Sequence, residues 1–182
     1  MSEKFPFAAV IFDMDGVIVD TERYYRDELR IFADSLGIDV TDEELDAQVG
    51  QSTQAFLRML VDWYERAGQG RMTIDEASRT YDAWAQTQTC DYAALMNPGV
   101  HEGIAGLKER GVRVALASSS PLDNIRSVLA ACGLSDAFEV IVSGVDFTES
   151  KPDPDIYLHT LAKLGLPAGA CCCIEDSVPG IA

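Results

Sequence analysis

Short apolar runs alternate along much of this chain with longer segments in which apolar residues recur every three or four positions. Runs such as Ala8 to Phe12 are typical of strands buried on both faces of a parallel sheet. The periodic segments are typical of amphipathic helices. Repeated strand-helix-strand units predict an α/β fold with a Rossmann-like, doubly wound parallel sheet. The predicted strands are 8–12, 112–117, 140–142 and 171–174, and the predicted helices are 100–110, 122–131 and 155–164.

The stretch from residue 21 to residue 95 breaks this alternation, because it contains no convincing strand and has helical patterns throughout. We therefore predict a Rossmann-like core of residues 1–20 and 96–182 and an inserted all-helical domain of residues 21–95. The helical features are two apolar faces (Tyr25, Leu29, Phe32 and Leu36; Phe56, Leu57, Leu60 and Tyr64) and two capping boxes (Thr41 with Glu44, Thr73 with Glu76).

Composition and charge narrow the class of protein. The chain has 182 residues, of which 47% are hydrophobic and 24% charged, as in ordinary folded proteins. No apolar run approaches the ~20 residues of a membrane-spanning helix, and no basic segment precedes an apolar one at the N-terminus, so we expect a cytoplasmic protein with no membrane partner. The formal net charge of -16 argues against a nucleic-acid partner. A phosphorylated small molecule could bind only where a metal ion and basic groups make the electrostatic potential locally positive.

The cysteines and histidines exclude several kinds of site. Cys171, Cys172 and Cys173 are consecutive on a predicted strand and have no Cys-x-x-Cys spacing, so we expect buried apolar packing for all three. The two histidines, His101 and His159, lie on predicted helices. Such scarcity argues against a histidine phosphoenzyme, a Ser-His-Asp triad and a three-histidine zinc site.

Two carboxylates follow the first predicted strand directly. Asp13 and Asp15 would lie at the C-terminal edge of the sheet, where open α/β sheets place their ligands. A calcium loop of the EF-hand type is excluded, because Gly16 is the fourth residue rather than the sixth and the motif follows a strand. Considered alone, the motif is also compatible with two solvated turn aspartates.

Four motifs, in order, resemble the signatures of the haloacid dehalogenase superfamily, and more closely those of the β-phosphoglucomutase-like phosphatases. The resemblance covers essentially the whole chain and argues against solvated turn aspartates. The motifs are Asp13-Met14-Asp15-Gly16-Val17-Ile18-Val19-Asp20, then Ser118 in Leu116 to Ser120, then Lys151 before Pro152, and finally the acidic pair Glu175-Asp176.

The resemblance implies that phosphoryl transfer proceeds through an aspartyl phosphate and requires Mg²⁺. Asp13 would be the nucleophile and a metal ligand. Asp15 would give its backbone carbonyl to the metal, while its side chain serves first as general acid and then as general base. Asp176 would complete the protein ligands, and Glu175 would support them. Hard oxygen ligands of this kind suit Mg²⁺.

The resemblance also implies where the substrate binds. In this family a cap that closes over the substrate is inserted between the first and second signatures, which is where the helical stretch falls. The expected contacts to phosphate are Met14 through its amide, Ser118, Ser119 and Lys151, and the expected contacts from the cap are Tyr25, Gln51, Ser52 and Thr53.

Asp15 favours phosphate esters, because family members that act on carbon–halogen bonds lack an acid at this position. We therefore expect a Mg²⁺-dependent phosphatase that hydrolyses a small metabolite, at family level a sugar phosphate. A mutase of the β-phosphoglucomutase type is an alternative, although Tyr25, Val49 and Thr53 stand where such mutases carry histidine, lysine and arginine. A module that binds phosphate without turnover is the other alternative.

The family continues beyond the fourth signature through a helix, a further strand and usually a final helix, whereas this sequence ends at Ala182. Part of the core is therefore expected to be missing. In the family order the first strand lies between the second and the fourth, so the fourth would be an exposed apolar edge. We expect either a truncated or processed monomer, or a homodimer in which a partner copy covers this edge.

Overall fold

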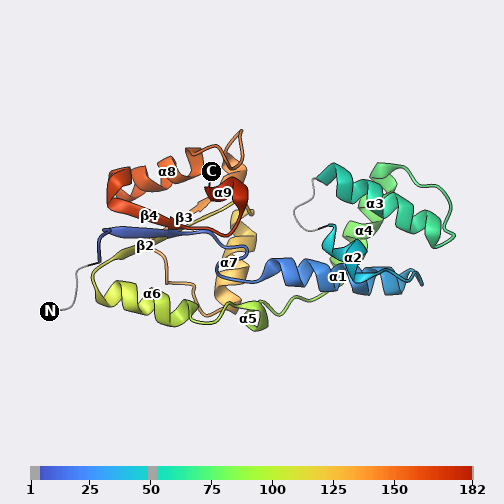
Figure 1. Cartoon of the computed structure of the whole chain (residues 1–182), viewed down its shortest axis with the longest axis horizontal. Coiled ribbons are helices and arrows are strands. Elements are labelled where there is room, and N and C mark those ends of the chain that lie inside the picture. The colour runs from blue at the N-terminus through green and yellow to red at the C-terminus, as the bar shows by residue number, and fades with distance from the viewer. Residues whose placement is uncertain (1–4, 49–52, 182) are drawn as a thin grey trace. The chain divides into compact units, whose positions relative to one another are not determined.

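The computed structural model describes residues 5–48 and 53–181. It divides into two compact units, each described by itself. The sheet unit comprises residues 1–21 and 91–182, and the helical unit comprises residues 22–90 (Figure 1). No helix in the described part of the chain is long and apolar enough to cross a membrane.

A parallel sheet forms the centre of the sheet unit. Its strands are β1 (Ala9–Phe12), β2 (Arg113–Ser118), β3 (Val140–Ser143) and β4 (Cys171–Ile174), in the order β3-β2-β1-β4. β1 pairs with β2 on one side and β4 on the other, and all four of its residues are buried because side chains pack on both faces of the sheet. The register sets Phe12 opposite both Leu116 and Ile174, so the C-terminal ends of these three strands lie together. The predicted α/β fold and strand order are confirmed.

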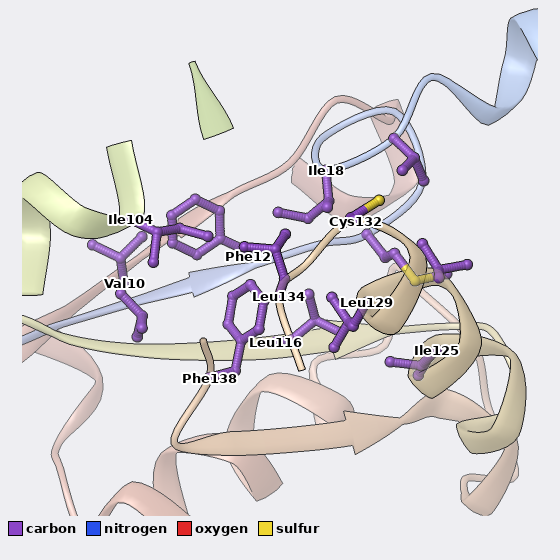
Figure 2. Close-up of a cluster of buried hydrophobic side chains, with 14 of the residues drawn as sticks. Val10, Phe12, Ile18, Ile104, Leu116, Ile125, Leu129, Cys132, Leu134 and Phe138 are labelled. Atoms are coloured by element: carbon purple, nitrogen blue, oxygen red, sulfur yellow. The ribbon is translucent and has the colours of Figure 1, made fainter. Parts of the chain in front are cut away.

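Alternate residues of β1 enter two separate cores. Val10 and Phe12 lie in the core with α6 (Val100–Glu109) and α7 (Leu122–Ala131), which Figure 2 shows. Ala9 and Ile11 pack on the opposite face with residues of α8 (Asp155–Leu164). Helices therefore cover both faces, as predicted. Shorter elements are α5 (Tyr92–Leu95), α9 (Val178–Ile181) and two 3-10 turns, Gly144–Asp146 and Ala168–Ala170.

The helical unit has its own aromatic core. It contains most of α1 (Thr21–Ser35), together with α2 (Asp42–Asp46), α3 (Thr53–Arg66) and α4 (Ile74–Ala85). Both predicted capping boxes are present, at the N-termini of α2 and α4. Phe32 is the centre of the core, with rings around it from Trp63, Tyr64, Tyr81 and Trp84.

Three details differ from the sequence analysis. The cysteines of β4 are not all buried, since Cys173 is exposed and Cys171 and Cys172 are partly exposed. The reason is that β4 is an edge strand, which pairs with β1 alone among the described strands.

The apolar face of α1 begins at Leu29 rather than Tyr25, because the Tyr25 side chain is 56% exposed, whereas Glu28 is buried. The predicted insertion was 21–95, whereas the helical unit comprises 22–90. Helix α5 belongs with the sheet unit, because Tyr92 and Leu95 pack against the core to which α6 and α7 contribute.

Candidate active site

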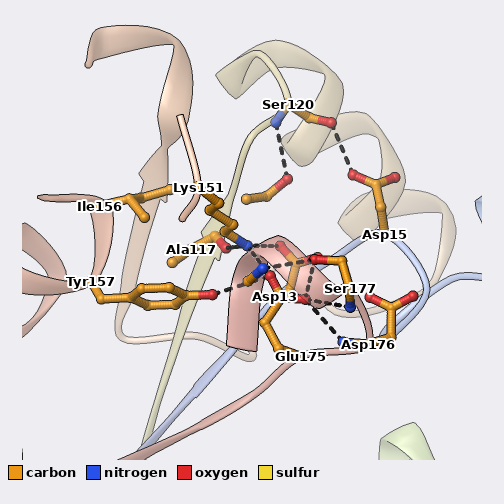
Figure 3. A network of polar contacts seen from close by, with 12 residues as sticks. Asp13, Asp15, Ala117, Ser120, Lys151, Ile156, Tyr157, Glu175, Asp176 and Ser177 are labelled. Carbon is orange, nitrogen blue, oxygen red and sulfur yellow. Dashed lines mark hydrogen bonds and ion pairs between the residues drawn. The ribbon is translucent and has the colours of Figure 1, made fainter. Parts of the chain in front are cut away.

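Polar side chains from four segments gather beyond the C-terminal ends of β1, β2 and β4 (Figure 3). Asp13 directly follows β1, Ser118 ends β2, and Glu175 directly follows β4. The Asp13 amide donates to the Ile174 carbonyl at 3.0 Å, which fixes the start of the Asp13 loop against β4. Lys151 reaches the same place from the segment between β3 and α8. The parallel sheet thus brings together residues that are far apart in the sequence.

Lys151 links two buried carboxylates. Its Nζ donates to Oδ1 of Asp13 at 2.8 Å and to Oε1 of Glu175 at 2.6 Å. The side chains of Lys151 and Asp13 are each 9% exposed and that of Glu175 is 4% exposed, so these ion pairs are shielded from water. Nζ also lies 5.2 Å from the centre of the Tyr157 ring. The lysine is therefore held in one place by three side chains.

Burial and the ion pairs act in opposite directions on these groups. Burial raises the pKa of Asp13 to about 6, even though the hydrogen bond from Lys151 lowers it. For Lys151, burial lowers the pKa, but the hydrogen bonds to Asp13 and Glu175 outweigh burial and raise the pKa above its ordinary value. Burial raises the pKa of Glu175, but Lys151 and the Ser177 amide together bring that pKa below its ordinary value. The site therefore favours a charged Lys151 and a charged Glu175.

Both oxygens of Glu175 are already occupied. Oε1 accepts from Lys151 and from the hydroxyl of Tyr157, the latter at 3.2 Å. Oε2 accepts from the amide of Asp176 at 2.9 Å and from the amide and hydroxyl of Ser177, each at 3.0 Å. This arrangement suits a group that orients its neighbours. Sequence reasoning missed Tyr157, whose position on an amphipathic helix carries no distinguishing signal.

Three acids could hold a cation. Asp13, Glu175 and Asp176 each offer a carboxylate oxygen, and these atoms all lie within 4.8 Å of one another. The donors are hard oxygens, the type that Mg²⁺ prefers, and one of the three acids, Asp176, is exposed. The residues present therefore fit a magnesium ion. Burial raises the pKa of Asp176, and the neighbouring charge of Glu175 raises it further.

Gly16 allows Asp176 to approach the loop after β1. The backbone of Gly16 has φ +76, and a Cβ atom built there would lie 1.8 Å from Oδ2 of Asp176. Asn97 holds the same loop, because its side-chain amide donates to the carbonyls of Gly16 at 2.8 Å and Val17 at 3.0 Å. Asn97 is not among the predicted site residues, because its only signal in the sequence is the Asn-Pro-Gly turn that it begins.

The Ser118 side chain is fully buried, and its Oγ accepts from the amide of Ser120 at 3.1 Å. The hydroxyl of Ser120 in turn donates to Oδ2 of Asp15 at 3.1 Å. Met14 hydrogen-bonds to the Asp13 carboxylate through its backbone, while the Met14 side chain is buried in the core. Ser119 is exposed. The structure thus brings Asp13, Ser118, Lys151 and the acidic pair together, and it adds Ser120, which the sequence analysis did not single out.

The other predicted contacts lie in the helical unit or outside the described residues. Tyr25 lies on α1 and is exposed. Val49, Gln51 and Ser52 lie outside the described residues, and so does the side chain of Thr53. His101 and His159 are exposed, on α6 and α8 respectively, and the His159 ring packs against Phe147.

Comparisons with known proteins agree with this arrangement. A family model described as haloacid dehalogenase-like hydrolase matches residues 7–182. Hexitol phosphatase B of Escherichia coli K12 is 38% identical over 184 residues, which cover 100% of this chain and 80% of that protein. The phosphorylated carbohydrates phosphatase of Thermotoga maritima is 30% identical over 177 residues, covering 95% of this chain and 78% of that protein. A solved Thermotoga maritima structure, described as a candidate beta-phosphoglucomutase, is similar to this chain with a TM-score of 0.79 and 30% sequence identity. The match covers 95% of this chain and 78% of the chain in that structure.

Proposed function

Because this chain belongs to the haloacid dehalogenase-like hydrolase family, we propose that it is a Mg²⁺-dependent phosphatase that hydrolyses the phosphate monoester of a small carbohydrate or sugar alcohol. The observation that carries the proposal is the Lys151 ammonium held between the carboxylates of Asp13 and Glu175 at 2.8 and 2.6 Å. The names of two relatives, a hexitol phosphatase and a phosphorylated carbohydrates phosphatase, support the substrate class.

Asp13 is the proposed nucleophile. Lys151 donates to its Oδ1 and so fixes the orientation of the carboxylate that attacks phosphorus. A bond forms between Asp13 and phosphorus while the bond to the leaving oxygen breaks, and Asp15 gives a proton to that oxygen. Asp15 then accepts a proton from a water molecule, which attacks phosphorus and frees Asp13. The result is inorganic phosphate and an alcohol.

The proposed magnesium ligands are Asp13, the backbone carbonyl of Asp15, and Asp176, with Glu175 supporting them. When bound there, Mg²⁺ supplies positive charge that offsets the repulsion between a carboxylate and a phosphate dianion.

The remaining positive charge comes from Lys151, which would stabilise the oxygens of the transferring phosphoryl group. Ser118, Ser119 and the amide of Met14 are the proposed hydrogen-bond donors to those oxygens. The helical unit is the proposed cap, with Tyr25, Gln51, Ser52 and Thr53 as proposed contacts to the substrate; this part rests on the resemblance to the family.

Phosphate release from a panel of phosphorylated metabolites, with and without Mg²⁺, tests the proposal. Activity should require the metal, and Asp13→Asn should abolish turnover because an amide is a poor nucleophile. Asp136→Asn is a matched control, since Asp136 is an exposed acid on another loop of the sheet unit. Full activity of Asp13→Asn would overturn the assignment.

The same panel separates the alternatives. A mutase shares the aspartyl phosphate but returns the phosphoryl group to a sugar, and one solved structure similar to this chain is described as a candidate beta-phosphoglucomutase. Conversion of β-glucose 1-phosphate to glucose 6-phosphate faster than phosphate release would favour a mutase. Tight binding of Mg²⁺ and phosphate without turnover of any compound would favour a binding module.

A further inference from the structure

The carboxylate of Asp15 is held by a residue of a neighbouring strand end. Among the described residues, the one side-chain hydrogen bond to this carboxylate comes from Ser120, whose hydroxyl donates to Oδ2 at 3.1 Å (Figure 3). Asp15 follows β1, and Ser120 lies two residues beyond β2. The contact therefore joins two loops at the same edge of the sheet.

Ser120 itself is fixed on its other sides. Its amide donates to Oγ of the buried Ser118 at 3.1 Å, and its carbonyl accepts from the hydroxyl of Ser143, at the end of β3, at 2.7 Å. The next residue, Gly144, packs closely on this turn, because a Cβ built there would lie 3.0 Å from Cα of Ser119. The ends of β2 and β3 thus hold the Ser120 hydroxyl in place.

We propose that Ser120 is a positioning residue that holds Asp15 by Oδ2 and leaves Oδ1 as the oxygen that passes the proton to the leaving group. This inference rests on the proposed function. A carboxylate oxygen that accepts a hydrogen bond is a poor site for the acidic proton, because the O–H oxygen of a carboxylic acid is a weak acceptor. The proton on Oδ1 moves to the leaving oxygen as the bond from that oxygen to phosphorus breaks, and the bonding electrons stay on that oxygen.

Ser120 therefore acts through Asp15 and not on the phosphoryl group. A general acid contributes most when the leaving group is strongly basic, and typically accelerates such a step by roughly 10²- to 10⁴-fold. An alkoxide leaving group needs this proton, whereas a nitrophenolate leaves without one. A change that misplaces Asp15 should therefore slow phosphoryl transfer to Asp13 from the first kind of substrate and spare that transfer from the second, whereas the later water step is common to both.

The test compares two substrates, sorbitol 6-phosphate and p-nitrophenyl phosphate, using the full chain with saturating Mg²⁺. For Ser120→Ala we expect kcat/KM on sorbitol 6-phosphate to fall about 10-fold and kcat/KM on p-nitrophenyl phosphate to stay within about 2-fold, because kcat/KM depends on the steps up to departure of the leaving group and not on the later water step. Ser120→Thr keeps a hydroxyl at the same position and should restore most of the activity. Ser127→Ala, on the exposed surface of α7, is the control for removal of a serine hydroxyl.

A double-mutant cycle with Asp15→Asn gives a second measurement. If Ser120 acts through Asp15, adding Ser120→Ala to Asp15→Asn should cause no further loss on either substrate. Additive losses would overturn the inference. So would an equal fall in kcat/KM on both substrates; if that fall came from a rise in KM alone, Ser120 would be a contact to the substrate. If the unchanged protein hydrolyses neither these two substrates nor any other member of the metabolite panel, the proposed function fails and the inference fails with it.

Discussion

Replacement of Gly16 by alanine is a sharp test of the proposed metal site. The added Cβ would lie 1.8 Å from Oδ2 and 2.3 Å from Cγ of Asp176, a separation that two non-bonded atoms cannot maintain. The carboxylate of Asp176 must therefore rotate away or the loop after β1 must shift. Either movement disturbs the placement of the Asp176 carboxylate beside Asp13, and we expect Mg²⁺ affinity to fall.

The backbone makes a second contribution, and a control variant isolates it. Gly16 has φ +76, where an L-residue costs about 1–2 kcal/mol of folding free energy. Gly165, at the end of α8, has φ +65 and no heavy atom within 4 Å of a built Cβ. Gly165→Ala should therefore carry the backbone cost alone. For a chain of this size, each kcal/mol lost lowers Tm by roughly 2–4 °C.

Calorimetric titration with Mg²⁺ and urea unfolding, applied to both variants, separate the two effects. Gly16→Ala should lose at least the roughly 10- to 100-fold in metal affinity that displacement of a supporting partner causes, and most of its turnover. Gly165→Ala should keep both while losing similar stability. Equal Mg²⁺ affinity and equal turnover in the two variants would refute the placement of Asp176 in the metal site.

Three further predictions concern buried polar groups. Lys151→Met removes the cation that lies 2.8 Å from Asp13, and steady-state kinetics should show a loss in kcat of roughly 10²- to 10³-fold. Tyr157→Phe removes the hydroxyl that donates to Glu175 but keeps the ring beside Lys151, so urea unfolding should show that the free energy of unfolding falls by about 0.5–1.5 kcal/mol. Tyr157→Leu also removes the ring, so its free energy of unfolding should fall further. Equal falls in the two variants would mean that the ring contributes nothing. Burial raises the pKa of Glu28 above its ordinary 4.5, so this carboxyl binds its proton more tightly in the folded state than in the unfolded state. The free energy of unfolding should therefore fall as pH rises from about 4.5 through the pKa of the folded state. Glu28→Gln should therefore match the unchanged protein in thermal unfolding at acid pH and exceed it near neutral pH.

Local sequence pattern predicted most of the sheet unit, because each strand is a short apolar run and each long helix has a clear period. The structure confirms these strands and helices, with ends that move by one residue at most. Burial of particular side chains was predicted less well. Cys173 is exposed because its strand is an edge, which depends on the neighbours of the strand and not on its own residues. Glu28 is buried, and its carboxylate accepts a hydrogen bond at 3.2 Å from Tyr81, which is far along the chain.

In the candidate site, too, some residues could be predicted from local motifs and others could not. Asp13 and Glu175 were predicted because each belongs to a motif at a strand end, and parallel strands bring such ends together, whereas Lys151 was predicted from its resemblance to the family's lysine signature before a helix. Ser120 and Tyr157 were not predicted, because their roles depend on which way a loop or a helix turns a side chain. Local sequence motifs therefore indicate the residues that are proposed to react, whereas the residues that orient them can be identified only from the three-dimensional structure.

The charges at this site also predict the order in which its ligands bind. The carboxylates of Asp13, Glu175 and Asp176 lie close together, and one ammonium group, that of Lys151, pairs with the first two, while the whole chain carries a formal charge of -16. Two like unit charges 4 Å apart repel by about 4 kcal/mol at an effective dielectric constant of 20, so a phosphate dianion is poorly accepted while these acids are ionised and unoccupied by a cation.

Mg²⁺ should therefore bind first and raise the affinity for phosphate. Thermodynamic linkage requires phosphate to raise the affinity for Mg²⁺ by the same factor, which we expect to be at least about 10-fold from the repulsion removed. Calorimetric titrations of phosphate with and without Mg²⁺, and of Mg²⁺ with and without phosphate, measure both factors. Phosphate binding that is equally tight in the absence of Mg²⁺ would show that Lys151 alone reverses the local potential.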